Sequence, residues 1–314
     1  MKALLRSTAI FGLAKFALRL LGALWLSYTL IFLVLHASGG QVISSDLPLS
    51  RQAQEALRKE LFLDRPLHQQ YFFYLKKIIS LEWGYSIHNR QMPLHTILAY
   101  AMLITAVLAI LAMLLTLPIA LAIALIAYFH PTHWIRQVIL ILMLLLGSLP
   151  TLILVPIAFL WIIHFQPSLY GATMIWYHPP WLTILSIVMA IPYIAIFARI
   201  LYTDLRFHPR QQYLAQYLAM GFSLPRTLWM LRSRMLLPIN KYMGTAFAQL
   251  LSGSILLEEF FRLPALGTLS LQAIRNRDYP VVLLTSMAFT LIFLLLTQLS
   301  AYLHTRLDPR SRYP

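Results

Sequence analysis

The chain has 314 residues, of which 60% are hydrophobic and only 11% are charged, and its mean hydropathy is +0.72. Soluble domains carry roughly 25% charged residues, so this composition excludes an ordinary soluble protein and indicates that a bilayer is the solvent. The net charge of +15 would also suit nucleic acid. The basic residues fall between apolar runs, however, which favours positive-inside membrane topology.

Six apolar runs are long enough to cross a bilayer, which takes about 20 residues. Backbone groups cannot stay unpaired in hydrocarbon, so these runs are predicted to be helices, and runs of this length argue against a transmembrane barrel. The predicted spans are about 20–38, 99–128, 136–163, 181–202, 240–257 and 280–303. Prolines lie inside three spans, where static kinks are the favoured interpretation and hinges the alternative; they are Pro118, Pro150, Pro156 and Pro192.

The first run follows four basic residues and reaches about Ala37 without a small-x-small cleavage site. It is predicted to be a first transmembrane helix that also targets the chain, and not a cleaved signal peptide. With the N-terminus inside, the inner segments hold fifteen basic and two acidic residues, and the outer segments hold ten and eight. Both termini are therefore predicted to be cytoplasmic.

Outside the membrane, the segment 41–97 is rich in aromatic residues and poor in glycine. Its Ala53, Leu57 and Leu61 recur at helical spacing, which indicates a small folded subdomain and not a linker. The predicted parts are the cytoplasmic N-terminus with the first helix (1–40), this periplasmic subdomain (41–97) and a core transmembrane domain (98–314).

A hydrophilic segment at 203–239 joins the fourth and fifth predicted spans on the cytoplasmic side. Residues 211–220 can form a helix, Gly221 suits a left-handed helix end, and a second helix is expected after Ser223, stopping at Pro238. Apolar side chains near the turn would fill a groove on a partner. A DNA-reading helix-turn-helix is disfavoured, because membrane spans tether the unit at both ends.

Residues 213–238 resemble the coupling loop, or EAA motif, of ABC importer permeases. In that motif a small residue lies two positions before a glycine, and a Leu-Pro pair follows about sixteen residues later. The matching residues here are Ala219, Gly221, Leu237 and Pro238. Tyr217 departs from the pattern, because the family usually has alanine there. The resemblance implies that these four residues and Tyr213 transmit movement from an ATPase.

Further segments, in order along nearly the whole chain, resemble the first-subunit type of dipeptide, oligopeptide and nickel permeases. They are 63–67, 82–86, 147–151, 261–267, 277–280 and 307–310. Glu82 stands where the family has aspartate, and Ala265 where it has glycine. The resemblance implies an all-α polytopic membrane protein with the ABC importer type I permease fold. About six transmembrane helices, an outer subdomain after the first helix and a cytoplasmic coupling helix are expected.

This resemblance also implies a function, namely a permease subunit that forms the translocation pathway of an ATP-driven importer, most commonly for peptides. Nickel, haem and cationic antimicrobial peptides remain alternative cargoes. No glycine is followed by lysine, so the chain lacks a phosphate-binding P-loop. ATP, Mg and hydrolysis are therefore expected on partner subunits, and the chain itself is expected to be neither an enzyme nor a holder of cofactors or metals. The implied partners are a second homologous permease, two ATP-binding subunits, an extracytoplasmic substrate-binding protein and the lipid of a bacterial inner membrane, without nucleic acid.

Candidate residues for the pathway or its outer gate are Gly147, Ser148, Pro150, Glu258 and Glu259. The two glutamates could meet a peptide amine or a docking binding protein, with ordinary rim charges as an equal alternative. The predicted spans hold almost no ionisable residues, which argues against a proton- or sodium-driven carrier. An intramembrane hydrolase is also disfavoured, because the His-Glu-x-x-His and Gly-x-Ser-x-Gly motifs are missing.

Overall fold

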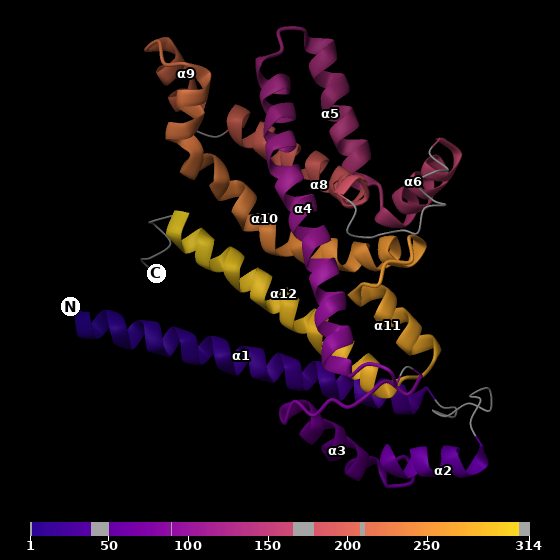
Figure 1. The fold of residues 1–314 in the computed structure, drawn as a ribbon. Coiled ribbons are helices and arrows are strands. Elements are labelled where there is room, and N and C mark those ends of the chain that lie inside the picture. The colour runs from indigo at the N-terminus through magenta and orange to yellow at the C-terminus, as the bar shows by residue number, and fades with distance from the viewer. Residues whose placement is uncertain (1, 39–49, 89, 166–178, 208–210, 308–314) are drawn as a thin grey trace. The chain divides into compact units, whose positions relative to one another are not determined.

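The computed structural model describes residues 2–38, 50–88, 90–165, 179–207 and 211–307. Within these ranges the regular elements are helices, which confirms the predicted all-α class (Figure 1). The elements are α1 (Lys2–Ala37), α2 (Arg51–Glu60), α3 (Leu67–Ile79), α4 (Leu94–Phe129), α5 (His133–Ser148), α6 (Thr151–Phe165), α8 (Pro179–Phe207), α9 (Gln211–Ala219), α10 (Leu224–Phe260), α11 (Leu266–Arg275) and α12 (Tyr279–Leu307).

The chain forms two compact units, and the boundary between them divides α4 and α12. Unit 1 comprises Met1–Ile104 and Pro264–Leu294, and unit 2 comprises Thr105–Leu263 and Leu295–Pro314. The segment predicted to be an outer subdomain lies in unit 1, and the predicted coupling loop lies in unit 2.

Among the described residues, four helices are long and apolar enough to cross a membrane by themselves, so the predicted polytopic membrane fold is confirmed. These spans are Phe16–Ala37, Leu94–Phe129, Leu182–Arg206 and Tyr279–His304. The pair α5 and α6 passes the same test only together, and the two helices meet at an angle of 97°. The predicted third span, 136–163, is therefore not one straight helix.

The break between α5 and α6 is explained by Pro150. Proline disfavours helical geometry at the residue before it, and Leu149 has the extended angles φ −71° and ψ 119°. Pro118, Pro156 and Pro192 instead lie inside continuous helices. Only Pro150 thus ends a helix where the sequence suggested a static kink.

The predicted fifth span, 240–257, lies within α10 but is not among the helices apolar enough to pass as spans. Polar groups at its start pair with α12 inside unit 2, which favours a helix of low apolarity at this position. Asn240 Nδ2 donates to the carbonyl of Ser300 at 2.9 Å, and Ser300 Oγ donates back to the carbonyl of Asn240 at 2.8 Å. Both residues are buried.

In unit 1, α2 begins at Ser50, whose Oγ accepts from the N–H of Ala53 at 3.3 Å as an N-cap. The helix buries Leu57 and Leu61 against Ile87. The helical face predicted from their spacing is therefore present. Leu57, Leu61 and Ile87 of the segment 41–97 thus pack together, and the boundaries of the predicted subdomain stay a prediction.

Several helices end in a residue with left-handed backbone angles. At the end of α3, Glu82 N–H donates to the carbonyl of Lys77 at 3.0 Å and Leu81 N–H to that of Ile78 at 3.3 Å, which is the Schellman arrangement. Leu81 has φ +59°. The corresponding residues after α2, α10 and α11 are Phe62, Arg262 and Arg277.

Candidate functional site

A cavity of about 350 Å³ lies in unit 2 at the break between α5 and α6. The break supplies Gly147, Ser148 and Pro150, so three of the candidate pathway residues line one space. The complete lining is Gly147, Ser148, Leu149, Pro150, Thr151, Pro192, Tyr193, Ile196, Gln249, Ser252, Gly253 and Leu256. None of these side chains is charged, and the polar ones are hydroxyls and one amide.

Two glycines let helices approach closely around this cavity. A Cβ added at Gly147 would lie 3.2 Å from Cγ1 of Ile196 in α8, and one added at Gly253 would lie 3.1 Å from both Cγ2 and Oγ1 of Thr151 in α6. Contacts this short require the neighbour to move. Glycine at these positions therefore keeps α5 against α8 and α6 against α10.

Sequence reasoning missed the cavity residues on α8 and α10. Gln249, Ser252 and Leu256 follow the i, i+3, i+7 spacing of one helical face, which could have indicated a shared surface. Tyr193 follows Pro192 and carried no comparable signal. Only the packing of α8 and α10 beside the α5–α6 break brings these residues to Ser148.

The two candidate gate glutamates lie elsewhere, in the last turn of α10, and neither lines the cavity. Glu258 is fully buried, and its Oε1 accepts from Thr105 Oγ1 at 2.9 Å. Glu259 is partly exposed. Ordinary rim charge therefore does not describe Glu258, whose carboxylate is held inside unit 2.

The helix, glycine turn and second helix predicted for the segment 203–239 are present as α9, Gly221 and α10. Gly221 has φ +84°, which is the left-handed geometry expected of it. Its N–H donates to the carbonyl of Leu218 at 3.0 Å, and Phe222 N–H donates to that of Tyr217 at 3.1 Å. The Tyr217 and Phe222 rings lie 5.8 Å apart, and the Arg226 guanidinium lies 5.1 Å from the Phe222 ring.

Most described side chains of α9 and the turn after it are exposed or half-buried. Tyr213 and Ala219 are exposed, as is Met220, while Leu214 is buried. Leu237 and Pro238 lie inside α10, so the expectation that the second helix stops at Pro238 is wrong. Membrane helices tolerate proline where neighbouring groups re-satisfy the backbone, and α10 continues to Phe260.

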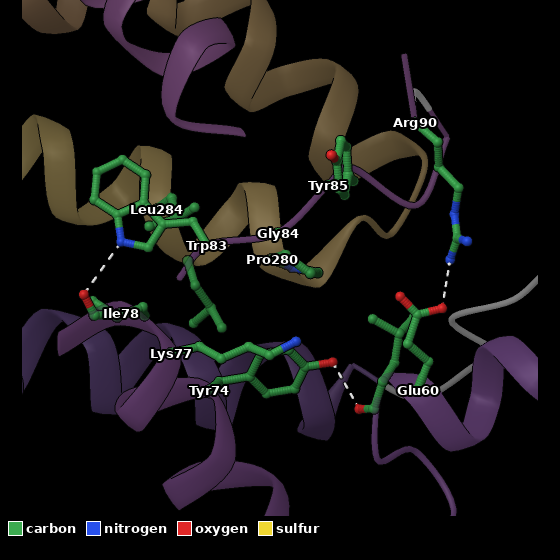
Figure 2. A pocket seen from close by; sticks show the side chains of 12 residues that line it. Glu60, Tyr74, Lys77, Ile78, Trp83, Gly84, Tyr85, Arg90, Pro280 and Leu284 are labelled. Carbon is green, nitrogen blue, oxygen red and sulfur yellow. Dashed lines mark hydrogen bonds and ion pairs between the residues drawn. The ribbon is translucent and has the colours of Figure 1, made fainter. Parts of the chain in front are cut away.

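A smaller pocket lies in unit 1 between α3, the segment after it and the start of α12 (Figure 2). Its apolar wall includes Trp83, whose Nε1 donates to the carbonyl of Ile78 at 3.2 Å. An exposed ion pair joins Arg90 Nη2 to Glu60 Oε2 at 3.0 Å beside it. Lys77 also lines the pocket, together with Glu60 and Arg90, so the pocket combines an apolar wall with charged groups.

Two of the segments singled out in the sequence meet in unit 1 at Asp278. Its Oδ2 accepts from Ser86 Oγ at 2.5 Å and from the N–H of Ile87 at 3.0 Å, and His88 Nδ1 lies 3.9 Å away. Burial raises the pKa of Asp278, while these donors and the N–H of Val281 act in the opposite direction. The carboxyl thus fastens the segment after α3 to the start of α12.

Comparison with known proteins agrees with the membrane-spanning helical fold. Residues 117–313, more than half of the chain, match the family described as binding-protein-dependent transport system inner membrane component. The dipeptide transport permease DppB of Bacillus subtilis is 28% identical over 287 residues, covering 90% of this chain and 91% of DppB. The glutathione transport permease GsiC of Escherichia coli strain K12 is 27% identical over 310 residues, covering 95% and 98%.

A Brucella abortus protein named as a peptide transport system permease is 30% identical over 279 residues, covering 84% of this chain and 86% of that protein. These relatives are membrane components of transporters and not enzymes. The family match, the apolar spans and the alignments over most of the chain all indicate a membrane component of a transporter. The chain belongs to the family of binding-protein-dependent transport system inner membrane components, as an ABC transporter permease.

Proposed function

We propose that this chain forms part of the translocation pathway of an ATP-driven importer of peptides. The observation that carries the proposal is the continuity of α10, which begins directly after the α9–Gly221 turn (Figure 1). Residues of α10 also form one wall of the uncharged cavity. One continuous helix thus joins the region proposed to meet an ATPase to the region proposed to meet the substrate.

The length of α10 suits a mechanical link. Ser252, on the cavity wall, follows the N-cap Ser223 by 29 residues, which corresponds to about 43 Å of helix. A displacement of α9 by a closing ATPase would tilt α10 and change the cavity wall. Such a device transports only if the ATP-bound and nucleotide-free states differ in their affinity for the binding protein or substrate.

The exposed side chains at α9 support movement being transmitted from an ATPase through α9 to α10. Tyr213 in α9 and Met220 just after it are exposed at 40% and 70%, and large apolar groups at a short helix suit a groove on a partner. The proposed partners are two ATP-binding subunits, which hold ATP and Mg, and a second permease chain. An extracytoplasmic binding protein would deliver the substrate, and both termini would lie in the cytoplasm of a bacterium.

The cavity chemistry supports a peptide cargo. Hydroxyls and the Gln249 amide can exchange hydrogen bonds with peptide groups, whose donors and acceptors are the same for every sequence. Because no lining residue is charged, the cavity wall forms no ion pair with a charged side chain of the substrate. The names of the relatives include dipeptide, glutathione and peptide transport.

The experiment is purification of the complex from its native membrane, followed by uptake of a radiolabelled dipeptide into proteoliposomes. The proposal predicts recovery of two P-loop ATPases with the chain, and uptake that needs ATP and survives a proton uncoupler. Uptake that continues without ATP but stops with the uncoupler would favour a secondary carrier. ATP-dependent uptake of nickel or haem that dipeptides fail to compete with would reject the cargo and keep the importer.

A further inference from the structure

Helix α3 packs against the middle of a membrane span in unit 1. Tyr28 OH, in α1, donates to the carbonyl of Tyr71 at 2.6 Å, and Thr29 Oγ1 lies 2.8 Å from Tyr71 OH. The Tyr28 and Tyr71 rings lie 5.0 Å apart. Tyr74, one turn further along α3, is buried in a cluster with Tyr28 and Leu283 of α12.

The positions of these contacts along two apolar spans indicate the depth of α3. Tyr28 precedes Ala37, the end of the α1 span, by nine residues, or about 14 Å of helix. Leu283 follows Tyr279, the start of the α12 span, by four residues, or about 6 Å. The hydrocarbon core is about 30 Å thick, so the packed face of α3 lies at membrane depth, within the leaflet where α1 ends and α12 begins.

The opposite side of α3 exposes large apolar side chains. Phe72 and Ile79, two turns apart on one face, are exposed at 64% and 73%. Leu81, just beyond the helix, is 72% exposed and has φ +59°. Left-handed geometry is unfavourable for leucine because its Cβ crowds the backbone, and within the described chain the Leu81 side chain gains no burial in return.

Charge placement on α3 fits a lipid surface. Lys76 is exposed between Phe72 and Ile79 on the same face, where its long stem can reach from apolar surroundings to a phosphate. Lys77 lies 4.5 Å from the Phe73 ring centre. Exposed aromatic and aliphatic groups beside lysine are the composition of helices that lie in the membrane interface.

We propose that α3 is an interfacial helix, with Phe72, Ile79 and Leu81 inserted among lipid chains and Lys76 at the headgroups. The segment 41–97, expected to be a periplasmic subdomain, then contacts the bilayer through α3. The proposal rests on the membrane-spanning character of α1 and α12 and not on the proposed import activity. The exposed face of α3 is covered by lipid, and neither by water nor by a second protein chain.

The test uses single cysteines, since the chain has none of its own. Phe72→Cys and Ile79→Cys are each spin-labelled in the complete complex in liposomes, with Glu55→Cys on the exposed polar surface of α2 as the matched control. Collision rates are measured with oxygen, which concentrates in lipid, and with a water-soluble nickel chelate. Exposed positions are chosen so that the labels leave the packed face of α3 intact.

The proposal predicts that the ratio of oxygen to nickel-chelate collisions at positions 72 and 79 is severalfold higher than at position 55. Equal ratios at all three positions would place this face in water and overturn the proposal. Immobilised labels that neither reagent reaches would show that a protein partner covers the face, which would overturn it as well. Each outcome is readable whether or not the complex transports peptides.

Discussion

The Tyr217 and Phe222 rings lie 5.8 Å apart across the Gly221 turn, and the N–H of Phe222 donates to the carbonyl of Tyr217 at 3.1 Å. This hydrophobic contact accompanies the Schellman end of α9. It gives a structural role to Tyr217, where related coupling loops usually have alanine. The turn in this chain is therefore closed by a ring pair in addition to its glycine.

Removing the Tyr217 ring should loosen this turn modestly. Aromatic pairs contribute about 0.5–1.5 kcal/mol beyond their burial, so Tyr217→Ala should speed amide hydrogen exchange at residues 219–223 by up to about tenfold. Tyr217→Phe keeps the ring and is the matched control. Equal exchange rates in the wild type and Tyr217→Ala would show that the ring pair contributes nothing.

Gly221→Val should uncouple ATP hydrolysis from uptake. Nothing lies within 4 Å of a Cβ added at Gly221, so the penalty comes from φ +84° and not from a clash; it amounts to about 1–2 kcal/mol for an L side chain. The measurement is the ratio of dipeptide uptake to ATP hydrolysis in proteoliposomes, which should fall severalfold.

Gly84→Val provides the control, because Gly84 has φ +72° and equally open surroundings but lies in unit 1. It should lower thermal stability by a similar amount and leave the uptake-to-hydrolysis ratio unchanged. Wild-type coupling in Gly221→Val would contradict the proposed role of the turn.

Gly253→Ala should constrict the cavity region, because the new Cβ would lie 3.1 Å from Cγ2 and Oγ1 of Thr151. Overpacking of this kind costs about 1–3 kcal/mol, and we expect a lower melting temperature and slower uptake. Thr151→Ala removes both opposing atoms, so the double variant should recover most of the loss. Failure of the second substitution to rescue the first would reject close α6–α10 packing as the cause.

Thr105→Val should destabilise unit 2, because it removes the hydroxyl that donates to the buried Glu258 carboxylate at 2.9 Å. Losing one partner of a buried polar group costs about 1–3 kcal/mol. Thermal unfolding of Thr105→Val, Glu258→Gln and the double variant forms a double-mutant cycle. Additive losses would show that the two side chains are not energetically coupled.

Asp278 should make stability depend on pH in a defined direction. Burial raises the pKa of Asp278 in the folded chain above the ordinary value of 3.8. At a pH between the unfolded-state pKa and the raised folded-state pKa, the folded state therefore binds more protons than the unfolded state. Stability should then fall as pH rises through a window that opens near 3.8 and extends upward. Melting temperature against pH measures this slope.

Asp278→Asn keeps an oxygen that can accept from Ser86 and Ile87 but cannot titrate. The melting temperature of Asp278→Asn should therefore change less with pH than that of the wild type across the same pH window. An unchanged slope would assign the pH dependence to other groups.

The sequence allowed prediction of features that local chemistry determines. Gly221 was predictable, because glycine enters left-handed geometry without penalty, and the apolar spans were predictable from their length. The left-handed Leu81 and Arg277 were not, since leucine and arginine rarely adopt that geometry. Nothing local marks them as helix ends.

Tertiary context determined the remainder. Pro150 ends a helix, whereas Pro238 lies inside one, because the outcome depends on which neighbours satisfy the backbone. Ser86 and Asp278 are separated by 192 residues, and both were noted as parts of motifs without any sign that they touch. Likewise, no pattern near Glu258 indicated burial beside Thr105.

The most direct test of the account is the accessibility of Ser252, which lies on the cavity wall formed by α10. Ser252→Cys, as the only cysteine of this chain, is exposed in the reconstituted complex to a membrane-impermeant thiol reagent from either side, with and without ATP and vanadate. If α10 transmits movement from α9, the side from which position 252 reacts should change with nucleotide. Reactivity that is the same in both nucleotide states would contradict the link between the coupling loop and the cavity.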